Sequence, residues 1–136
     1  VLSAYRFACV GRTDSMGVHK PGQYRIPEFE SFERFVCEWL PKQDIERMDY
    51  IFRPQWMFVC NGQGEVMVDH LGRLEEMDDT VAMLSEKLEK QVLIRNENST
   101  RAAMIDYREY YKNSNMVDVV GSLYRRDIDN FEYKFE

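Results

Sequence analysis

Six large apolar residues between Pro27 and Pro41 set the strongest constraint on how this chain can fold. They are Phe29, Phe32, Phe35, Val36, Trp39 and Leu40. Their spacing of three and four residues places them on one face of an α-helix, as a broad apolar stripe. Proline is tolerated in the first turn of a helix and ends a helix further along. The sequence therefore predicts a helix from Pro27 to Leu40 that is buried along one face.

Four other segments show the same helical spacing of apolar residues: 1–9, 77–88, 104–111 and 116–124. Ser114 or Asn115 is placed to cap the last of these helices. Between the first helix and Pro27, the stretch from Gly11 to Ile26 holds three glycines, a proline and few apolar residues, so it is expected to be a long surface loop. Helix is thus expected to dominate the chain.

A short β-hairpin is predicted between these helices. Val66 and Val68 lie two residues apart, the period of a half-buried strand over residues 65–68, and Asn61-Gly62-Gln63-Gly64 suits a tight turn. Residues 57–60 would form the partner strand. Gly72 follows the hairpin and is expected to adopt backbone angles that other residues avoid. Asp78 and Asp79 suit the N-terminus of the helix that comes next.

Composition indicates one folded domain and excludes two classes of partner. With 44% hydrophobic residues in 136, the chain can bury a single core. Its apolar runs reach only four or five residues, against roughly 20 for a membrane-spanning helix, so no membrane contact is expected from this segment. The formal charge of −6 argues against nucleic acid as a partner, because a surface that follows phosphates is basic.

The three cysteines, Cys9, Cys37 and Cys60, lack the close paired spacing of a zinc site or a redox dithiol. Buried free thiols are expected, and a single disulfide with one thiol left over is the alternative. No metal site is predicted.

Two places carry residues that suit an anion. Ser3 has a hydroxyl near the start of the first helix, where free backbone N–H groups can surround a phosphate, and Arg6 lies one turn further on. A helix cap or a surface serine is the alternative for Ser3, and a solvated side chain is the alternative for Arg6.

The second place follows a predicted strand over residues 92–94 and precedes a predicted helix. It consists of Asn98, Ser99, Thr100 and Arg101. Two hydroxyls and a guanidinium at a helix N-terminus form a cluster suited to an anion. A plain helix cap is the alternative. Asn98-Ser99-Thr100 is also a glycosylation sequon, but a glycan there would obstruct the proposed anion site, so glycosylation is not expected.

Three stretches together resemble the carbohydrate sulfotransferases of sulfotransferase family 2. Residues 69–75 are similar to that family's Asp-aromatic-hydrophobic-Gly-Arg/Lys-aromatic-Glu pattern, with His70 in an aromatic position. Residues 1–7 look like the tail of its 3′-phosphate motif, which leads into Leu-Val-Ser-Ala-Tyr. Residues 119–135 are similar to its closing Tyr-x-x-Asp-hydrophobic-x-x-Phe-x-Tyr-x-Phe. A fourth stretch, Arg53-Pro54-Gln55, matches a His-x-x-Pro-Gln segment without its histidine.

The resemblance implies an α/β fold, here the mostly helical C-terminal part of a P-loop-like sulfotransferase fold with the short hairpin. It implies transfer of a sulfuryl group from 3′-phosphoadenosine 5′-phosphosulfate to a carbohydrate hydroxyl, without a metal. Ser3 and Arg6 would contact the 3′-phosphate, and Asn98 to Arg101 would lie near the nucleotide. The loop that holds the 5′-phosphosulfate does not precede Val1, so residues 1–136 are expected to form one partial domain.

No catalytic residue is assigned, because the base of such relatives usually precedes the 3′-phosphate motif. The alternative function is a non-catalytic module of the same fold that binds a glycan or a protein. Bacterial relatives are expected in the cytoplasm and animal relatives in the Golgi lumen behind an upstream anchor, so the resemblance leaves the compartment open.

Overall fold

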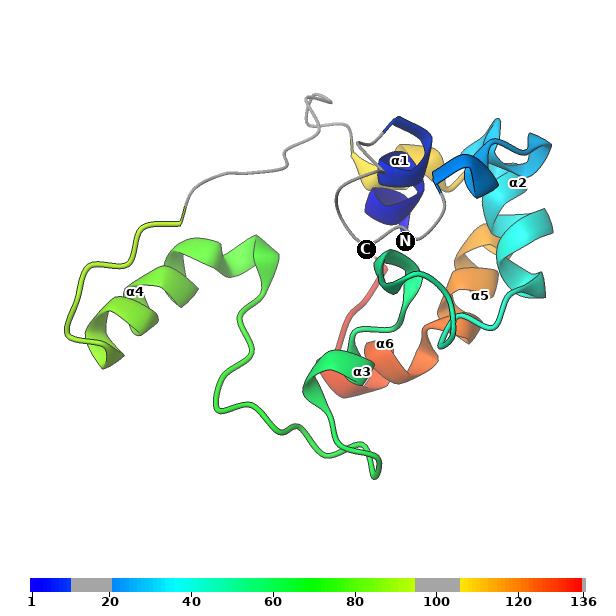
Figure 1. Cartoon of the computed structure of the whole chain (residues 1–136). Helices are drawn as coiled ribbons and strands as arrows, with labels where there is room; N and C mark the ends of the chain where they lie inside the picture. Colours follow the sequence, from blue (N-terminus) through cyan, green and yellow to red (C-terminus); the bar gives the residue numbers. More distant parts are fainter. Residues whose placement is uncertain (11–20, 95–105, 136) are drawn as a thin grey trace. The chain divides into compact units, whose positions relative to one another are not determined.

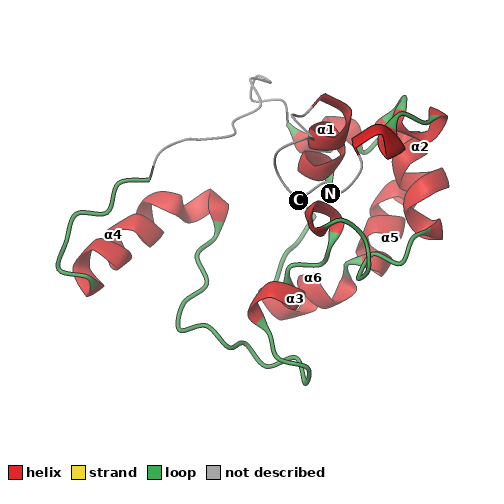
Figure 2. Cartoon of the chain, viewed as in Figure 1, coloured by secondary structure: helices red, strands yellow, loops and turns green. Residues whose placement is uncertain are grey.

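The computed structural model describes residues 1–10, 21–94 and 106–135, and this part of the chain is built from helices joined by turns (Figures 1 and 2). The α-helices are α1 (Leu2–Val10), α2 (Phe32–Arg34), α3 (Trp56–Val59), α4 (Met77–Lys87), α5 (Ser114–Leu123) and α6 (Arg125–Phe131). Short 3₁₀ and π turns lie between them. The chain divides into two compact units, Val1–Val66 with Ala102–Glu136, and Met67–Arg101.

The predicted α/β fold with a β-hairpin is wrong for the described residues, which contain no strand. Residues 57–59 of the predicted first strand (57–60) lie instead in the single helical turn α3. The carboxylate of Asp127 accepts hydrogen bonds from the backbone N–H groups of Gln55, at 2.7 Å, and Trp56, at 2.8 Å. Gln55 and Trp56 lie at the start of α3, where the first N–H groups of a helix have no acceptor within the helix. A side chain 71 residues away thus stabilises helix where the local pattern favours strand.

The second predicted strand is also absent. The turn after α3 closes with Asn61 N–H donating to Glu65 O at 2.9 Å, and pairing beyond it is a single antiparallel bridge between Cys60 and Val66. Val66 is 45% exposed and Val68 is 40% exposed. An alternating segment forms a strand when one face is buried against other elements, and here no such surface covers these valines.

The apolar stripe from Phe29 to Leu40 is confirmed, but it is not one continuous α-helix. A 3₁₀ turn over Pro27–Phe29 is separated from α2 by Ser31, whose backbone is extended (φ −142°). The Ser31 hydroxyl accepts a hydrogen bond from Arg34 N–H at 3.2 Å and so caps α2. The helix then continues through a π turn (η3, Phe35–Trp39) and a 3₁₀ turn (η4, Leu40–Lys42). Pro41 therefore lies inside the last turn.

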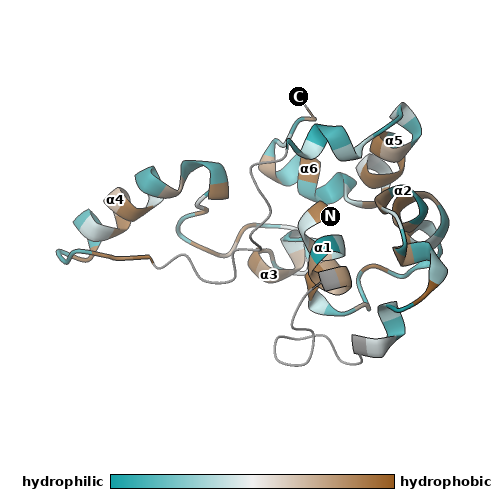
Figure 3. Cartoon of the chain, turned by 90° about the horizontal axis from the view of Figure 1, so that it is seen from above, coloured by the Kyte–Doolittle hydropathy of each residue, from teal (hydrophilic) through white to brown (hydrophobic). Residues whose placement is uncertain are grey.

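Aromatic rings form the core of the first unit around Phe35, which is fully buried. Its ring centroid lies between 5.1 and 6.0 Å from five others, those of Tyr5, Phe29, Phe32, Trp39 and Phe52. Helix α5 packs against η3 and contributes Met116, also fully buried. Figure 3 shows brown apolar residues on α1, α2 and α5, the helices that supply this core.

Two other predicted helices differ from the structure in detail. The last one is α5, and its cap is Asn113, whose side-chain oxygen accepts from Met116 N–H at 3.1 Å. The cap is therefore one residue earlier than predicted. Of the helix predicted over 104–111, the described part forms a 3₁₀ turn (η7, Tyr107–Tyr110). None of the described helices combines the length and the apolar character that a membrane crossing requires.

The second unit contains α4, which agrees with the predicted helix over 77–88. Gly72, just before it, does not have the positive φ predicted for it; among the described glycines that conformation belongs to Gly64, at φ +90°. Space is the reason for glycine at 72. A Cβ there would lie 2.6 Å from Thr80 Cγ2 and 2.7 Å from Thr80 Oγ1.

We expect Gly72→Ala to destabilise the start of α4 by about 1 kcal/mol, because Thr80 must rotate and give up its 3.1 Å hydrogen bond to the Glu76 carbonyl. Hydrogen exchange of the α4 amides would measure this. Gly62→Ala is the control, since nothing lies within 4 Å of a Cβ at that position. The double variant Gly72→Ala/Thr80→Ala should cost no more than Thr80→Ala alone; additive costs would contradict the clash.

Candidate functional site

Ser3 and Arg6 lie one turn apart on α1, on the same side of the helix. The first helical hydrogen bond runs from Tyr5 N–H to Val1 O at 3.0 Å, so the N–H groups of residues 2–4 have no acceptor inside the helix. Ser3 is exposed and Arg6 is half-buried. Arg6 forms no hydrogen bond or ion pair with any residue that the structure describes. This arrangement can present a hydroxyl, backbone donors and a cation to an anion.

The other predicted anion cluster, Asn98 to Arg101, lies outside the described residues, as does most of the predicted loop from Gly11 to Ile26. Whether the two predicted halves of a donor site meet stays a prediction. The described end of that loop is a 3₁₀ turn, η1 (Pro21–Tyr24), and Tyr24 is buried in the aromatic core.

Tyr5 fixes α1 to the rest of the unit. Its hydroxyl donates to the carbonyl of Phe29 at 3.1 Å, and its ring lies 5.1 Å from that of Phe35. The Tyr5 hydroxyl is a donor at neutral pH, and burial raises its pKa further above the ordinary value. With Tyr5 on the packed side, Ser3 is left facing solvent.

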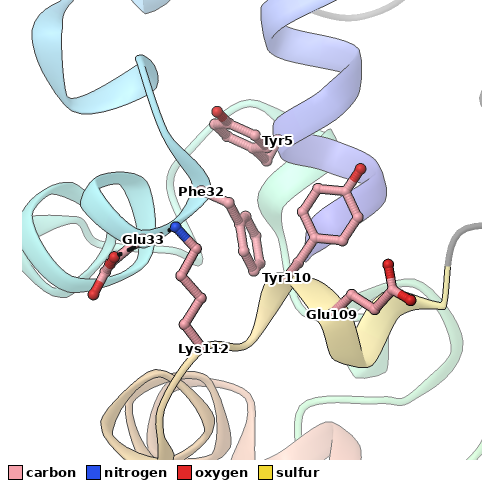
Figure 4. Close-up of a pocket in the computed structure, with 6 residues that line it drawn as sticks. All are labelled: Tyr5, Phe32, Glu33, Glu109, Tyr110 and Lys112. Atoms are coloured by element: carbon pink, nitrogen blue, oxygen red, sulfur yellow. Dashed lines mark ion pairs between the residues drawn. The ribbon is translucent and has the colours of Figure 1, made fainter.

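A pocket of about 410 Å³ opens beside Tyr5 and is the second candidate site (Figure 4). Its lining comes from α1, from the start of α2 and from the segment around η7, and consists of Tyr5, Phe32, Glu33, Glu109, Tyr110 and Lys112. The ring of Phe32 lies 5.3 Å from that of Tyr5 and meets Tyr110 edge to face at 5.9 Å. Three aromatic rings therefore form the apolar part of the pocket.

Charged groups lie around these rings on opposite sides. Lys112 Nζ lies 3.9 Å from a Glu33 carboxylate oxygen, and the other oxygen accepts from Asn113 Nδ2 at 3.2 Å. Across Phe32, the carboxylate of Glu109 makes no hydrogen bond or ion pair with any residue that the structure describes (Figure 4). The pocket thus carries two carboxylates and one ammonium.

Residues of the closing motif hold the chain around α3. The Tyr124 hydroxyl donates to the carbonyl of Phe52 at 2.7 Å, and Asp127, three residues on, caps α3. Burial raises the pKa of Tyr124 well above its ordinary value. The apolar spacing placed Tyr124 on the buried face of a helix but gave Asp127 no role. The spacing of three between them, which puts both on one side of a helix, was the available signal.

Arg126 and Arg53 also have structural contacts. The Arg126 guanidinium lies 3.6 Å from the centre of the Trp56 ring, a cation–π contact, and a Cβ on Gly64 would meet its Nη2 at 2.7 Å. Arg53 donates from Nε to the carbonyl of Met48 at 2.6 Å. The Arg53-Pro54-Gln55 stretch therefore holds backbone in place, and Gln55 contributes its N–H to Asp127.

The cysteines are free thiols, with Cys9 exposed and Cys37 and Cys60 half-buried, so the predicted burial is wrong for Cys9. The described residues contain no group of three or more metal-ligating side chains.

Comparison with family models, with curated proteins and with solved structures found no match for this chain.

Proposed function

We propose that this chain is part of a sulfotransferase that transfers a sulfuryl group from 3′-phosphoadenosine 5′-phosphosulfate to a carbohydrate hydroxyl. The observation that carries the proposal is the pair Ser3 and Arg6, which share one side of α1 inside the stretch that resembles the family's 3′-phosphate motif. Arg6 has no acidic partner among the residues that the structure describes. The similar order of the other motif-like stretches supports the same reading.

The chemistry of the pair suits a terminal phosphate. The Ser3 hydroxyl and N–H groups of the first helical turn are hydrogen-bond donors, and the helix dipole favours negative charge at that end. Arg6 adds a charge-assisted hydrogen bond, which is stronger than a neutral one. In the complete enzyme, transfer would depend on positioning and on stabilisation of the developing charge. We assign no catalytic base within this chain.

A second candidate function is a non-catalytic module that binds a glycan or a protein. The pocket of aromatic rings and carboxylates beside Tyr5 favours it, since that pocket can bind a ligand without any nucleotide. Nucleotide binding separates the two candidates.

We expect Ser3→Ala and Arg6→Ala each to weaken binding of adenosine 3′,5′-bisphosphate about tenfold or more, because each removes a hydrogen bond to a charged phosphate worth about 1.5–3 kcal/mol. Binding of adenosine 5′-phosphate should change little, since it lacks the 3′-phosphate. Calorimetric titration of the 136-residue chain with both nucleotides measures this difference. Arg6→Lys should keep part of the affinity for adenosine 3′,5′-bisphosphate. Lysine retains the positive charge but cannot donate the two parallel N–H hydrogen bonds of a guanidinium.

Two exposed residues of the same unit serve as matched controls. Ser122→Ala removes a hydroxyl from the exposed side of α5, and Arg47→Ala removes one positive charge from a side chain that is 87% exposed. Neither should alter the titration. Equal losses for both nucleotides in the Ser3 and Arg6 variants would mean that these residues only maintain α1. Failure of the unaltered chain to bind either nucleotide would overturn the donor site proposed here and favour the binding module.

A further inference from the structure

We infer that the pocket beside Tyr5 is a sugar subsite, which binds one pyranose ring that carries no acidic group. That this sugar would be the acceptor of the sulfuryl group rests on the proposed sulfotransferase function. That the pocket binds a sugar at all rests only on the residues that line it. The volume of about 410 Å³ lies within the usual range for small-molecule sites and leaves room for one such ring.

The aromatic part of the pocket is a platform that is already in place. Phe32 is only 5% exposed and packs against Phe35 of the core, so it supports the half-buried rings of Tyr5 and Tyr110, which a sugar can reach. The hydrogen bond to Phe29 O holds Tyr5 in place. Tyr110 stands edge to face against Phe32. Binding to fixed rings requires little ordering of side chains. One face of a pyranose ring presents C–H groups, whose slightly positive hydrogens suit the negative face of an aromatic ring.

The charged rim of the pocket, formed by Glu33, Glu109 and Lys112, supplies hydrogen-bond partners for hydroxyl groups on both sides of a pyranose ring. Glu109 offers an exposed carboxylate that has no partner among the described residues and can accept hydrogen bonds from sugar hydroxyls. On the opposite side, the long 3.9 Å separation between Lys112 Nζ and the Glu33 oxygen leaves the ammonium able to donate to a hydroxyl oxygen. Hydrogen bonds to charged groups are the stronger kind.

The charge of the rim selects among sugars. Glu33 and Glu109 outnumber Lys112, so the pocket carries a net negative charge. A uronic acid or a sulfated sugar would bring like charge to these carboxylates, whereas a neutral hexose or an amino sugar would not. The same argument disfavours the phosphates of a nucleotide, so this pocket and the Ser3–Arg6 pair differ in the ligand they select.

Saturation-transfer NMR with the whole chain tests the inference, using methyl glucoside, glucosamine and glucuronic acid at millimolar concentrations as probes. We expect contact with the first two and a much weaker signal from glucuronic acid. Glu109→Gln should weaken binding of methyl glucoside about tenfold, because a neutral amide replaces a charged acceptor. Tyr110→Ala should abolish the signal from the sugar's C–H face. Glu46→Gln, which removes one exposed carboxylate elsewhere in the unit, should change nothing.

Circular dichroism of each variant verifies that it is folded. Absence of binding by the unaltered chain would overturn the inference, as would a signal that persists in Glu109→Gln and Tyr110→Ala. Stronger binding of glucuronic acid than of methyl glucoside would refute the charge selection, and competition by adenosine at this pocket would reassign it to a nucleobase. These results use other ligands and other variants than the nucleotide titration, so either proposal can fail while the other holds.

Discussion

Replacement of Asp127 by alanine should lower the free energy of unfolding by about 3 kcal/mol and remove the helical turn α3. The Asp127 carboxylate is 8% exposed and accepts the backbone N–H groups of Gln55 and Trp56. Without it, both donors would lose a charged acceptor, and each hydrogen bond of that kind is worth about 1.5–3 kcal/mol. Urea denaturation followed by circular dichroism measures the change.

Asp129 provides the matched control, since it lies on the same helix but is 61% exposed and paired with the exposed Arg125. Asp129→Ala should cost less than about 0.5 kcal/mol, as exposed ion pairs contribute little. Asp127→Asn should fall between the two, because an amide oxygen can accept the N–H groups but carries no full charge. Equal costs for Asp127→Ala and Asp129→Ala would show that the cap does not stabilise α3.

Replacement of Phe35 by alanine should lower the free energy of unfolding by about 3–5 kcal/mol, the usual cost of truncating a buried phenylalanine. The side chain is fully buried, and five other aromatic rings lie around it. Those rings cannot all move into the space, so a cavity remains. Urea denaturation gives the free energy, and loss of near-ultraviolet dichroism would report loosened packing of the rings.

The control for this change is Phe58→Ala, which removes the same side chain from a position that is 54% exposed. Its cost should be well below that of Phe35→Ala, and Phe35→Leu should also cost less than Phe35→Ala because it leaves a smaller cavity. If Phe35→Ala and Phe58→Ala destabilised the chain equally, Phe35 would not be the centre of the core.

Helices were predicted most successfully where apolar residues recur at helical spacing. The stripe from Phe29 to Leu40 and the helices α1, α4 and α5 follow from apolar spacing along the chain, because that spacing decides which side chains share a face. The breaks were not predicted. The extended backbone at Ser31 and the π turn Phe35–Trp39 adjust how the stripe meets the other core rings, and spacing alone carries no information about those rings.

The candidate sites show the same limit. Ser3 and Arg6 are three residues apart, so their shared side of α1 could be predicted from the sequence, whereas their role with a nucleotide stays a prediction. The pocket could not be predicted, because Tyr5, Phe32 and Tyr110 come from three distant segments. From the sequence alone, each of these aromatic residues could equally have been a core residue.

The sequence by itself determined the apolar faces of the main helices, since the period of a helix relates neighbouring residues to one another directly. Only the tertiary structure decided the state of residues 57–59, which were predicted as strand and form helix because Asp127 accepts hydrogen bonds from the N–H groups at the start of α3. It likewise decided that Gly72 is needed for space beside Thr80 rather than for its backbone angles. In both cases the contact comes from a residue, Asp127 or Thr80, that reaches its partner only in the folded chain. The sequence pattern around residues 57–59 or around Gly72 contains no information about that contact.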